Sequence, residues 1–136
     1  RIPEVAPRSL IGIEHLGKIA EQLRPGDGLL LATGWSSRWG TPQYREELPR
    51  VSRDLAHWCV DHRVRVLGVE PPSVADVNNR QEVEEIHGIL LCGGVIIVEG
   101  LTNLKAISTP LVLFAAFPLK IKGGDGSPVR AVAIEE

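Results

Sequence analysis

Apolar residues recur at helical spacing in three segments of the chain, each bounded by residues that start or stop helices. The first segment is predicted to begin at Ser9 and to end at the Pro-Gly pair at 25–26. The second follows Ser52, a residue type favoured as an N-cap. The third follows the Asn pair at 78–79 and ends at the Gly pair at 93–94.

Short apolar runs separated by turn residues predict strands. Three of these runs alternate with the helical segments, which favours an α/β fold with helical crossovers. Two more lie in the last third of the chain, where glycines between them are typical of a hairpin connection. Residues 34–49, which include Trp35, Trp39 and Tyr44, are predicted to form a long ordered loop. The predicted strands are 29–33, 63–69, 95–98, 111–117 and 129–134.

Composition limits the class of protein. With 136 residues, 43% of them hydrophobic and 24% charged, the chain is expected to form a single globular domain over residues 1–136. The net charge of −2 offers no basic surface, so we expect no nucleic-acid partner. The longest apolar run, 111–117, is too short to span a bilayer, so we expect no membrane association.

Cysteine and methionine usage adds two expectations. Two cysteines do not make a disulfide framework, which favours a reducing, cytoplasmic setting. Cys59 lies on the apolar stripe of its predicted helix, where a free cysteine behaves as a small hydrophobic residue. The chain contains no methionine, so we expect it to be a fragment or a processed piece of a longer product.

His87 and Glu99 are the candidate metal ligands. His87 shares the apolar stripe of the third helical segment, so its imidazole is predicted to point into the fold. A core histidine bonded to a backbone carbonyl is the alternative. Glu99 ends a run of four aliphatic residues, and a carboxylate is seldom left there without a partner. Ligands of open α/β sheets gather at the carboxyl ends of strands, so an imidazole and a carboxylate meeting there suit zinc or manganese.

Several motifs resemble the C-terminal half of the cyclase family of metal-dependent hydrolases, which includes bacterial kynurenine formamidases and isatin hydrolases. Residues 30–40 resemble the family's central strand and following loop, and residues 66–73 resemble its Gly-Val-Asp-x-Pro-Ser segment. Residues 119–132 are similar to its closing hairpin. The resemblance implies a cyclase-like swivelling β/β/α architecture, with a mixed sheet, helical crossovers and a C-terminal β-hairpin. It also implies that His87 and Glu99 are metal-coordinating positions.

The chain departs from the family pattern at several positions. Glu70 stands where an aspartate is common, and Gly88 stands where some formamidases have a second histidine. The family's N-terminal His-x-Gly-Thr-His-x-Asp motif has no counterpart, and the histidine implicated in proton transfer is missing with it. His57 and His62 do not replace this motif, because they are five residues apart rather than four. No catalytic residue is therefore assigned, and the metal site is expected to be incomplete in this chain.

The resemblance implies a metal-activated water that hydrolyses C–N bonds in amide-like substrates such as N-formylkynurenine or isatin. Trp35 and Trp39 are candidates for a substrate pocket, although they could equally anchor a loop or a subunit contact. We expect this segment alone to be inactive and to bind metal weakly. The alternative is a non-catalytic truncated paralogue, an oligomerisation module with the same fold. Either way, we expect a homo-oligomer or an association with a missing N-terminal segment.

Overall fold

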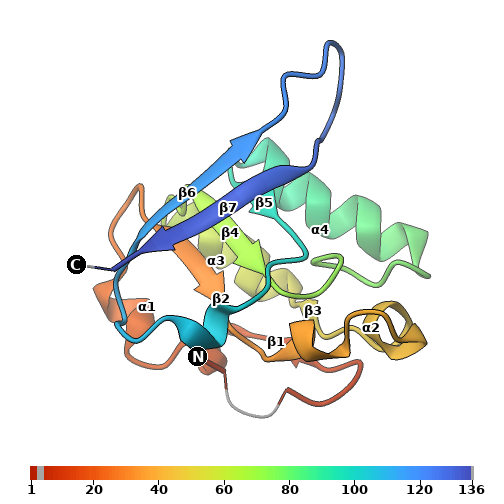
Figure 1. The fold of residues 1–136 in the computed structure, drawn as a ribbon, viewed down its shortest axis with the longest axis horizontal. Helices are drawn as coiled ribbons and strands as arrows, with labels where there is room; N and C mark the ends of the chain where they lie inside the picture. The colour runs from red at the N-terminus through yellow and green to blue at the C-terminus, as the bar shows by residue number, and fades with distance from the viewer. Residues whose placement is uncertain (3–4, 136) are drawn as a thin grey trace. The chain divides into compact units, whose positions relative to one another are not determined.

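A computed structural model describes residues 1–2 and 5–135 of the chain, which divide into two compact units, Arg1–Leu104 and Lys105–Glu136 (Figure 1). Each unit is described by itself below. That all 136 residues act as a single domain stays a prediction.

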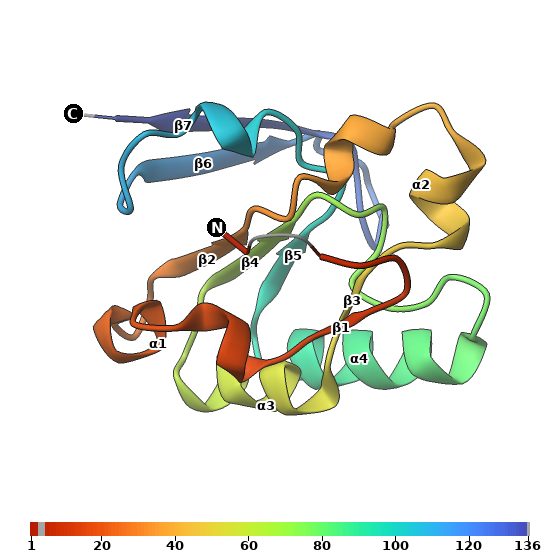
Figure 2. The same ribbon diagram turned by 90° about the horizontal axis from the view of Figure 1, so that it is seen from below.

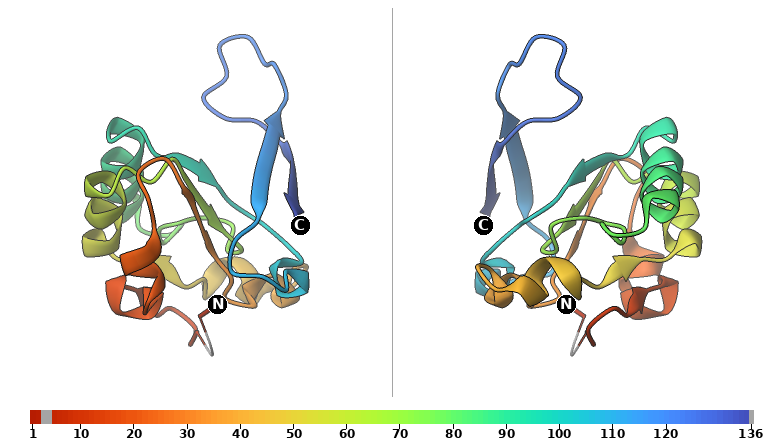
Figure 3. Two further views of the ribbon diagram at one scale, coloured as in Figure 1. Left: turned by 90° about the vertical axis from the view of Figure 1, so that its left-hand side faces the viewer. Right: turned by 90° about the vertical axis from the view of Figure 1, so that its right-hand side faces the viewer.

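The first unit is built on a three-stranded parallel sheet in the order β2 (Gly28–Leu31), β4 (Val66–Val69), β5 (Ile96–Val98). Leu67 of the central strand pairs with Leu29 on one side and with Ile97 on the other. Parallel neighbours require crossovers, which α3 (Arg53–Asp61) and α4 (Arg80–Cys92) supply. Both helices cover the same face of the sheet (Figures 2 and 3). The predicted α/β alternation is confirmed.

Capping residues set the ends of these two helices. The Ser52 hydroxyl accepts a hydrogen bond from the Leu55 backbone N–H at 3.1 Å, as expected for an N-cap. Asn79, rather than Asn78, caps α4, with its side-chain oxygen 3.3 Å from the Glu82 nitrogen. Gly93 is the C-cap of α4. The boundaries predicted from Ser52, the Asn pair and the Gly pair are therefore confirmed.

The segment from Ser9 to Leu23, predicted as one helix, is instead divided into three short elements: β1 (Leu10–Ile11), the 3₁₀ helix η1 (Ile13–Leu16) and α1 (Ile19–Gln22). Gly17 ends η1 with φ of 54°, a conformation that an α-helix cannot continue through. Ahead of it, β1 pairs in parallel with β3 (Arg50–Val51). The apolar stripe is buried in the core, but through this irregular path rather than on a helix.

The predicted loop at 34–49 contains two short helices, η2 (Trp35–Arg38) and α2 (Pro42–Glu46). Its order comes from a small core of its own, made by Trp35, Tyr44 and Leu48. Within this core, the Trp35 indole N–H donates to the Tyr44 carbonyl at 2.9 Å. The segment is ordered as predicted, but it contains these two short helices rather than loop alone.

The main core lies between the sheet and its helices. Leu55 and Cys59 of α3, Leu67 of β4 and Leu90 of α4 are fully buried. Burial raises the pKa of the Cys59 thiol to about 12, so Cys59 is an inert core residue, as its position in the sequence indicated. None of the helices in the described ranges is long and apolar enough to cross a membrane.

The second unit is a β-hairpin of β6 (Leu113–Pro118) and β7 (Val129–Ile134), preceded at its boundary by the 3₁₀ helix η3 (Leu104–Ala106). The strands are antiparallel, with Leu113 opposite Ile134 and Pro118 opposite Val129. This confirms the predicted C-terminal hairpin. Parallel and antiparallel pairing thus occur in separate sheets, one kind in each unit.

Candidate metal and substrate site

The carboxyl ends of β2, β4 and β5 meet at one edge of the sheet, because the three strands are parallel and adjacent. Thr33 follows β2, Glu70 directly follows β4 and Glu99 directly follows β5. Polar groups are therefore gathered at the edge where ligands of open α/β sheets bind.

His87 and Glu99 are brought together as the sequence predicted. His87 Nε2, in the middle of α4, lies 3.3 Å from Glu99 Oε1, and the two side chains are 27% and 31% exposed. His87 Nδ1 lies 2.9 Å from the Val83 carbonyl oxygen. A carbonyl only accepts, so Nδ1 carries a proton, and Nε2 is the nitrogen that faces the carboxylate. The Val74 backbone N–H donates to the same oxygen, Glu99 Oε1, at 2.9 Å and helps to hold the carboxylate in place.

This contact affects protonation. The hydrogen bond to Glu99 raises the pKa of His87, partial burial opposes the rise, and the Glu99 charge and the Val83 carbonyl add to it. The contact with Glu99 thus favours the protonated form of His87 relative to a free imidazole. A proton on Nε2 occupies the position that a metal ion would need, so metal and proton compete for this nitrogen.

The donors fit half of a metal site. An imidazole oriented by a backbone carbonyl on its other nitrogen is the usual arrangement of a metal-binding histidine, and a carboxylate beside it suits zinc or manganese. In residues 1–2 and 5–135, however, no group of three or more His, Cys, Asp or Glu side chains is arranged to hold an ion. His87 and Glu99 alone supply fewer protein ligands than a catalytic zinc site usually has.

Glu70 is a carboxylate that the sequence analysis noted only as a replacement for aspartate. It is 2% exposed and accepts hydrogen bonds from Thr33, Gly34 and Ser36, which lie just after β2. The signal that pointed to Glu99 also applied to Glu70, since each is an acidic residue directly after an apolar strand. Its partners are far away in the sequence, so the pattern could not have shown them.

The two candidate pocket tryptophans lie in different environments. Trp35 is 2% exposed and its ring is in the small core, as the loop-anchor alternative described, with the Arg38 guanidinium 4.5 Å above it. Trp39 is 74% exposed and lies edge-on against Tyr44, with ring centroids 5.2 Å apart. Trp39 is therefore the tryptophan with a ring face available to a ligand.

Tyr44 connects this aromatic pair to the strand ends. Its hydroxyl donates to the Glu70 backbone carbonyl at 2.8 Å. Burial raises the pKa of Tyr44, and the charges of Glu70 and then Glu99 raise it further. The phenol thus lies within electrostatic range of both carboxylates. A Cβ added to Gly100, the residue after Glu99, would lie 3.7 Å from the Tyr44 hydroxyl oxygen.

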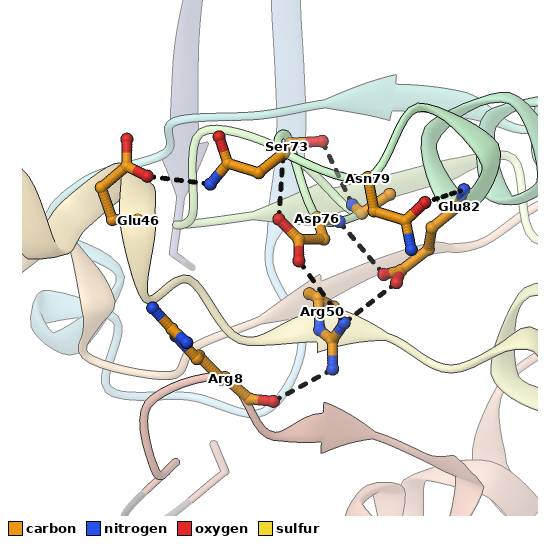
Figure 4. A network of polar contacts seen from close by, with 9 residues as sticks. Arg8, Glu46, Arg50, Ser73, Asp76, Asn79 and Glu82 are labelled. Carbon is orange, nitrogen blue, oxygen red and sulfur yellow. Dashed lines mark hydrogen bonds and ion pairs between the residues drawn. The ribbon is translucent and has the colours of Figure 1, made fainter.

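A polar network supports the loop that contacts Glu99 (Figure 4). Arg50 of β3 donates to Glu82 of α4 at 2.9 Å and to the Arg8 carbonyl at 3.1 Å, and it lies 3.9 Å from Asp76. The Asp76 N–H donates to Glu82 at 3.1 Å. The network joins the loop before α4 to the first turn of that helix, and the same loop supplies the Val74 N–H to Glu99.

Comparisons with known proteins agree with this architecture. The family model described as "Putative cyclase" matches residues 3–76. The chain is 34% identical to the kynurenine formamidase of Geobacillus thermodenitrificans over 132 residues, which is 96% of this chain and 59% of that protein. It therefore spans well under two thirds of the length of this relative.

Solved structures show the same fold. A "potential metal-dependent hydrolase with cyclase activity" is 29% identical and matches with a TM-score of 0.70, over 95% of this chain and 64% of that one. Isatin hydrolase A from Labrenzia aggregata matches with a TM-score of 0.82 at 24% identity, over 96% of this chain and 56% of that one. The predicted cyclase-like fold is confirmed, and the chain belongs to the cyclase family of hydrolases.

Proposed function

We propose that this chain is part of a metal-dependent hydrolase that cleaves C–N bonds in amide-like substrates. The observation that carries the proposal is the His87–Glu99 pair, 3.3 Å apart at the carboxyl edge of a parallel sheet. The relatives support it, because one is a kynurenine formamidase and a structural neighbour is described as a metal-dependent hydrolase.

In this proposal, His87 Nε2 and Glu99 hold a zinc or manganese ion together with further ligands that the described residues do not supply. When bound, such an ion lowers the pKa of a coordinated water and polarises the amide carbonyl. The Val83 carbonyl keeps the His87 ring in the tautomer that leaves Nε2 available, and the Val74 N–H keeps the carboxylate in place. No residue of the chain is assigned to proton transfer.

N-formylkynurenine and isatin are the proposed substrates, since they are the compounds for which the family's formamidases and isatin hydrolases are named. Both contain a benzene ring fused or linked to the amide-like group. The exposed face of Trp39, held against Tyr44, is suited to stack on such a ring.

The test compares the polypeptide isolated from its natural source with the 136-residue chain. With zinc or manganese, the natural polypeptide is expected to hydrolyse N-formylkynurenine or isatin, and His87→Ala and Glu99→Gln are expected to abolish turnover. Glu85→Gln, a matched control on α4 whose carboxylate pairs with Arg53, is expected to retain it. Turnover that survives both site substitutions would contradict the assignment.

A second candidate function, the non-catalytic module, is favoured by one observation: the described residues offer two clustered ligands rather than three. A natural polypeptide inactive on both substrates would support this alternative. For the 136-residue chain alone, we expect no turnover above that of free metal ions, and calorimetric titration is expected to show metal binding weaker than micromolar.

We also propose that the chain associates, either with a second copy or with a further segment of the natural protein. Both faces of the β6–β7 hairpin are mostly apolar: Leu113, Phe117 and Ile134 lie on one, together with Arg130, and Phe114 and Ala131 lie on the other. A two-stranded hairpin is marginal by itself and needs a packing partner. Light scattering on the eluate of a sizing column tests this, and a monomer that persists at high concentration would contradict it.

A further inference from the structure

Both oxygens of the buried Glu70 carboxylate accept hydrogen bonds from one turn of the chain. Oε2 accepts from the Thr33 N–H at 2.7 Å, from the Thr33 hydroxyl at 3.0 Å and from the Gly34 N–H. Oε1 accepts from the Ser36 hydroxyl at 2.8 Å. Gly34 has φ of 74°, which turns successive N–H groups toward a single anion, an arrangement called a nest. The turn after β2 is thus an anion site filled by the protein's own carboxylate.

This turn leads directly into the aromatic surface. Trp35 begins η2 next to Gly34, and Trp39 ends it, with its N–H donating to the Ser36 carbonyl at 3.1 Å. The other half of the aromatic pair, Tyr44, donates its hydroxyl to the backbone carbonyl of Glu70. Glu70 therefore holds both members of the pair. Its carboxylate holds the turn that leads to Trp39, and its backbone carbonyl accepts the hydrogen bond from the Tyr44 hydroxyl.

A buried charge is costly, and the cost is offset only where enough hydrogen bonds replace water. Here the four donors meet that condition, and they fix the turn in one conformation. Without the carboxylate, two backbone N–H groups and two hydroxyls would converge on an empty space, and the turn would have to open to hydrate them.

We propose that Glu70 is a positioning residue of the site: it holds the exposed Trp39 ring and the Tyr44 ring beneath it in place and so determines how well the protein binds the aromatic ring of its substrate. The inference rests on the proposed function for its choice of ligand. It places Glu70 outside the chemical step, because the carboxylate is buried and its two oxygens accept from Thr33, Gly34 and Ser36.

Two substitutions distinguish the effect of the Glu70 carboxylate from the effect of side-chain volume. Glu70→Gln keeps the shape: its carbonyl oxygen can accept from Thr33 and Gly34, while its amide donates to the Ser36 hydroxyl, which can reverse. Glu70→Ala removes the equivalent of one acetate molecule and leaves the nest unfilled. Added acetate is therefore expected to restore the turn in Glu70→Ala, and a structural role without the nest geometry would not respond to it.

The experiment uses the metal-free 136-residue chain and formanilide, a simple aromatic formamide, as the probe. Nitrogen-15 NMR follows the indole N–H signals of the three tryptophans, with Trp58 on α3 as an internal control. In the unaltered chain, formanilide is expected to shift the Trp39 signal and not that of Trp58. Because the probe is tested without metal and without turnover, this result is independent of whether the hydrolase proposal holds.

Glu70→Ala is expected to move the Trp39 signal and to weaken formanilide binding about tenfold, equivalent to about 1.4 kcal/mol. Added acetate is expected to restore both the Trp39 signal and formanilide binding. Glu70→Gln is expected to show a Trp39 signal and an affinity close to those of the unaltered chain. Glu84→Ala, which removes a carboxylate hydrogen-bonded to Arg80 on α4, is the matched control and is expected to leave the Trp39 signal in place.

Should Glu70→Ala fail to fold, the double substitution Thr33→Val, Ser36→Ala removes the two hydroxyl donors and is expected to move the Trp39 signal and weaken binding in the same direction. The proposal is overturned if formanilide leaves Trp39 unshifted in the unaltered chain. It is also overturned if folded Glu70→Ala binds the probe with unchanged affinity, or if acetate fails to restore binding.

Discussion

Gly93→Ala is expected to destabilise the chain, although a glycine in this conformation is usually improved by alanine. Gly93 has φ of −78° and ψ of 0°, values open to any residue. At such a position, alanine typically stabilises by about 0.4–1 kcal/mol through the unfolded state. Here, however, the new Cβ would lie 2.3 and 2.7 Å from the two Cγ atoms of Val60 and 3.0 Å from the Ile89 carbonyl oxygen.

Val60 is β-branched, so its side chain cannot easily rotate away, and α3 and α4 must separate instead. Overpacking of this kind costs about 1–3 kcal/mol, so once the entropic gain is subtracted the net loss in the free energy of unfolding lies between zero and about 2.6 kcal/mol, about 1.3 kcal/mol at the middle of both ranges. The sign of the effect is therefore decided by one close contact between the two helices.

Urea denaturation of a double-mutant cycle tests this reasoning. In a Val60→Ala background the contact is gone, so Gly93→Ala is expected to become neutral or slightly stabilising. Gly88→Ala is the control on the same helix: nothing lies within 4 Å of its added Cβ, so it should stabilise by up to about 1 kcal/mol. If Gly93→Ala stabilises as Gly88→Ala does, or costs the same with and without Val60, the argument from the contact fails.

Three further predictions use the same chain. Ser52→Ala removes the N-cap of α3 and is expected to cost about 1 kcal/mol in urea denaturation, and a loss below about 0.3 kcal/mol would contradict the role of the cap. The pKa of His87 is raised, so the His87–Glu99 pair stabilises the metal-free chain below the unfolded-state pKa of histidine, and this stability is lost as pH rises through the folded-state pKa. Glu99→Gln should remove that pH dependence, and a stability profile unchanged by the substitution would refute it. Only the exposed Cys92 should react with a thiol reagent in the folded chain, since Cys59 is buried with a pKa near 12, and two equivalents of rapid reaction would disprove this.

Local signals accounted for the elements that were predicted correctly. The ends of α3 and α4 follow from short-range capping by Ser52 and Asn79, whose partners lie three residues away. The strands follow from apolar runs between turn residues. The failure from Ser9 to Leu23 has a long-range cause: Leu10 and Ile11 pair with Arg50 and Val51, which a helical pattern cannot reveal.

In the site, too, contacts indicated by the local pattern were predictable and contacts between distant segments were not. His87 and Glu99 were predictable together, because a residue on the apolar stripe of a crossover helix and a residue ending the next parallel strand converge at one edge. The hydrogen-bond partners of Glu70 could not be predicted, since these donors lie 34 to 37 residues earlier in the chain. Only the alignment of β2 with β4 brings them together.

The parallel pairing of β2, β4 and β5 also makes each side of the site depend on a different crossover. A parallel pair cannot form until the crossover between its strands is in place, so the entropy of closing that loop opposes each step. Helices with their own caps, such as α3 and α4, can form much faster. Joining β4 to β2 brings Glu70 to its turn and assembles the aromatic side. The pairing of β5 with β4 places Glu99 beside His87, so the metal side depends on the second crossover and the aromatic side on the first.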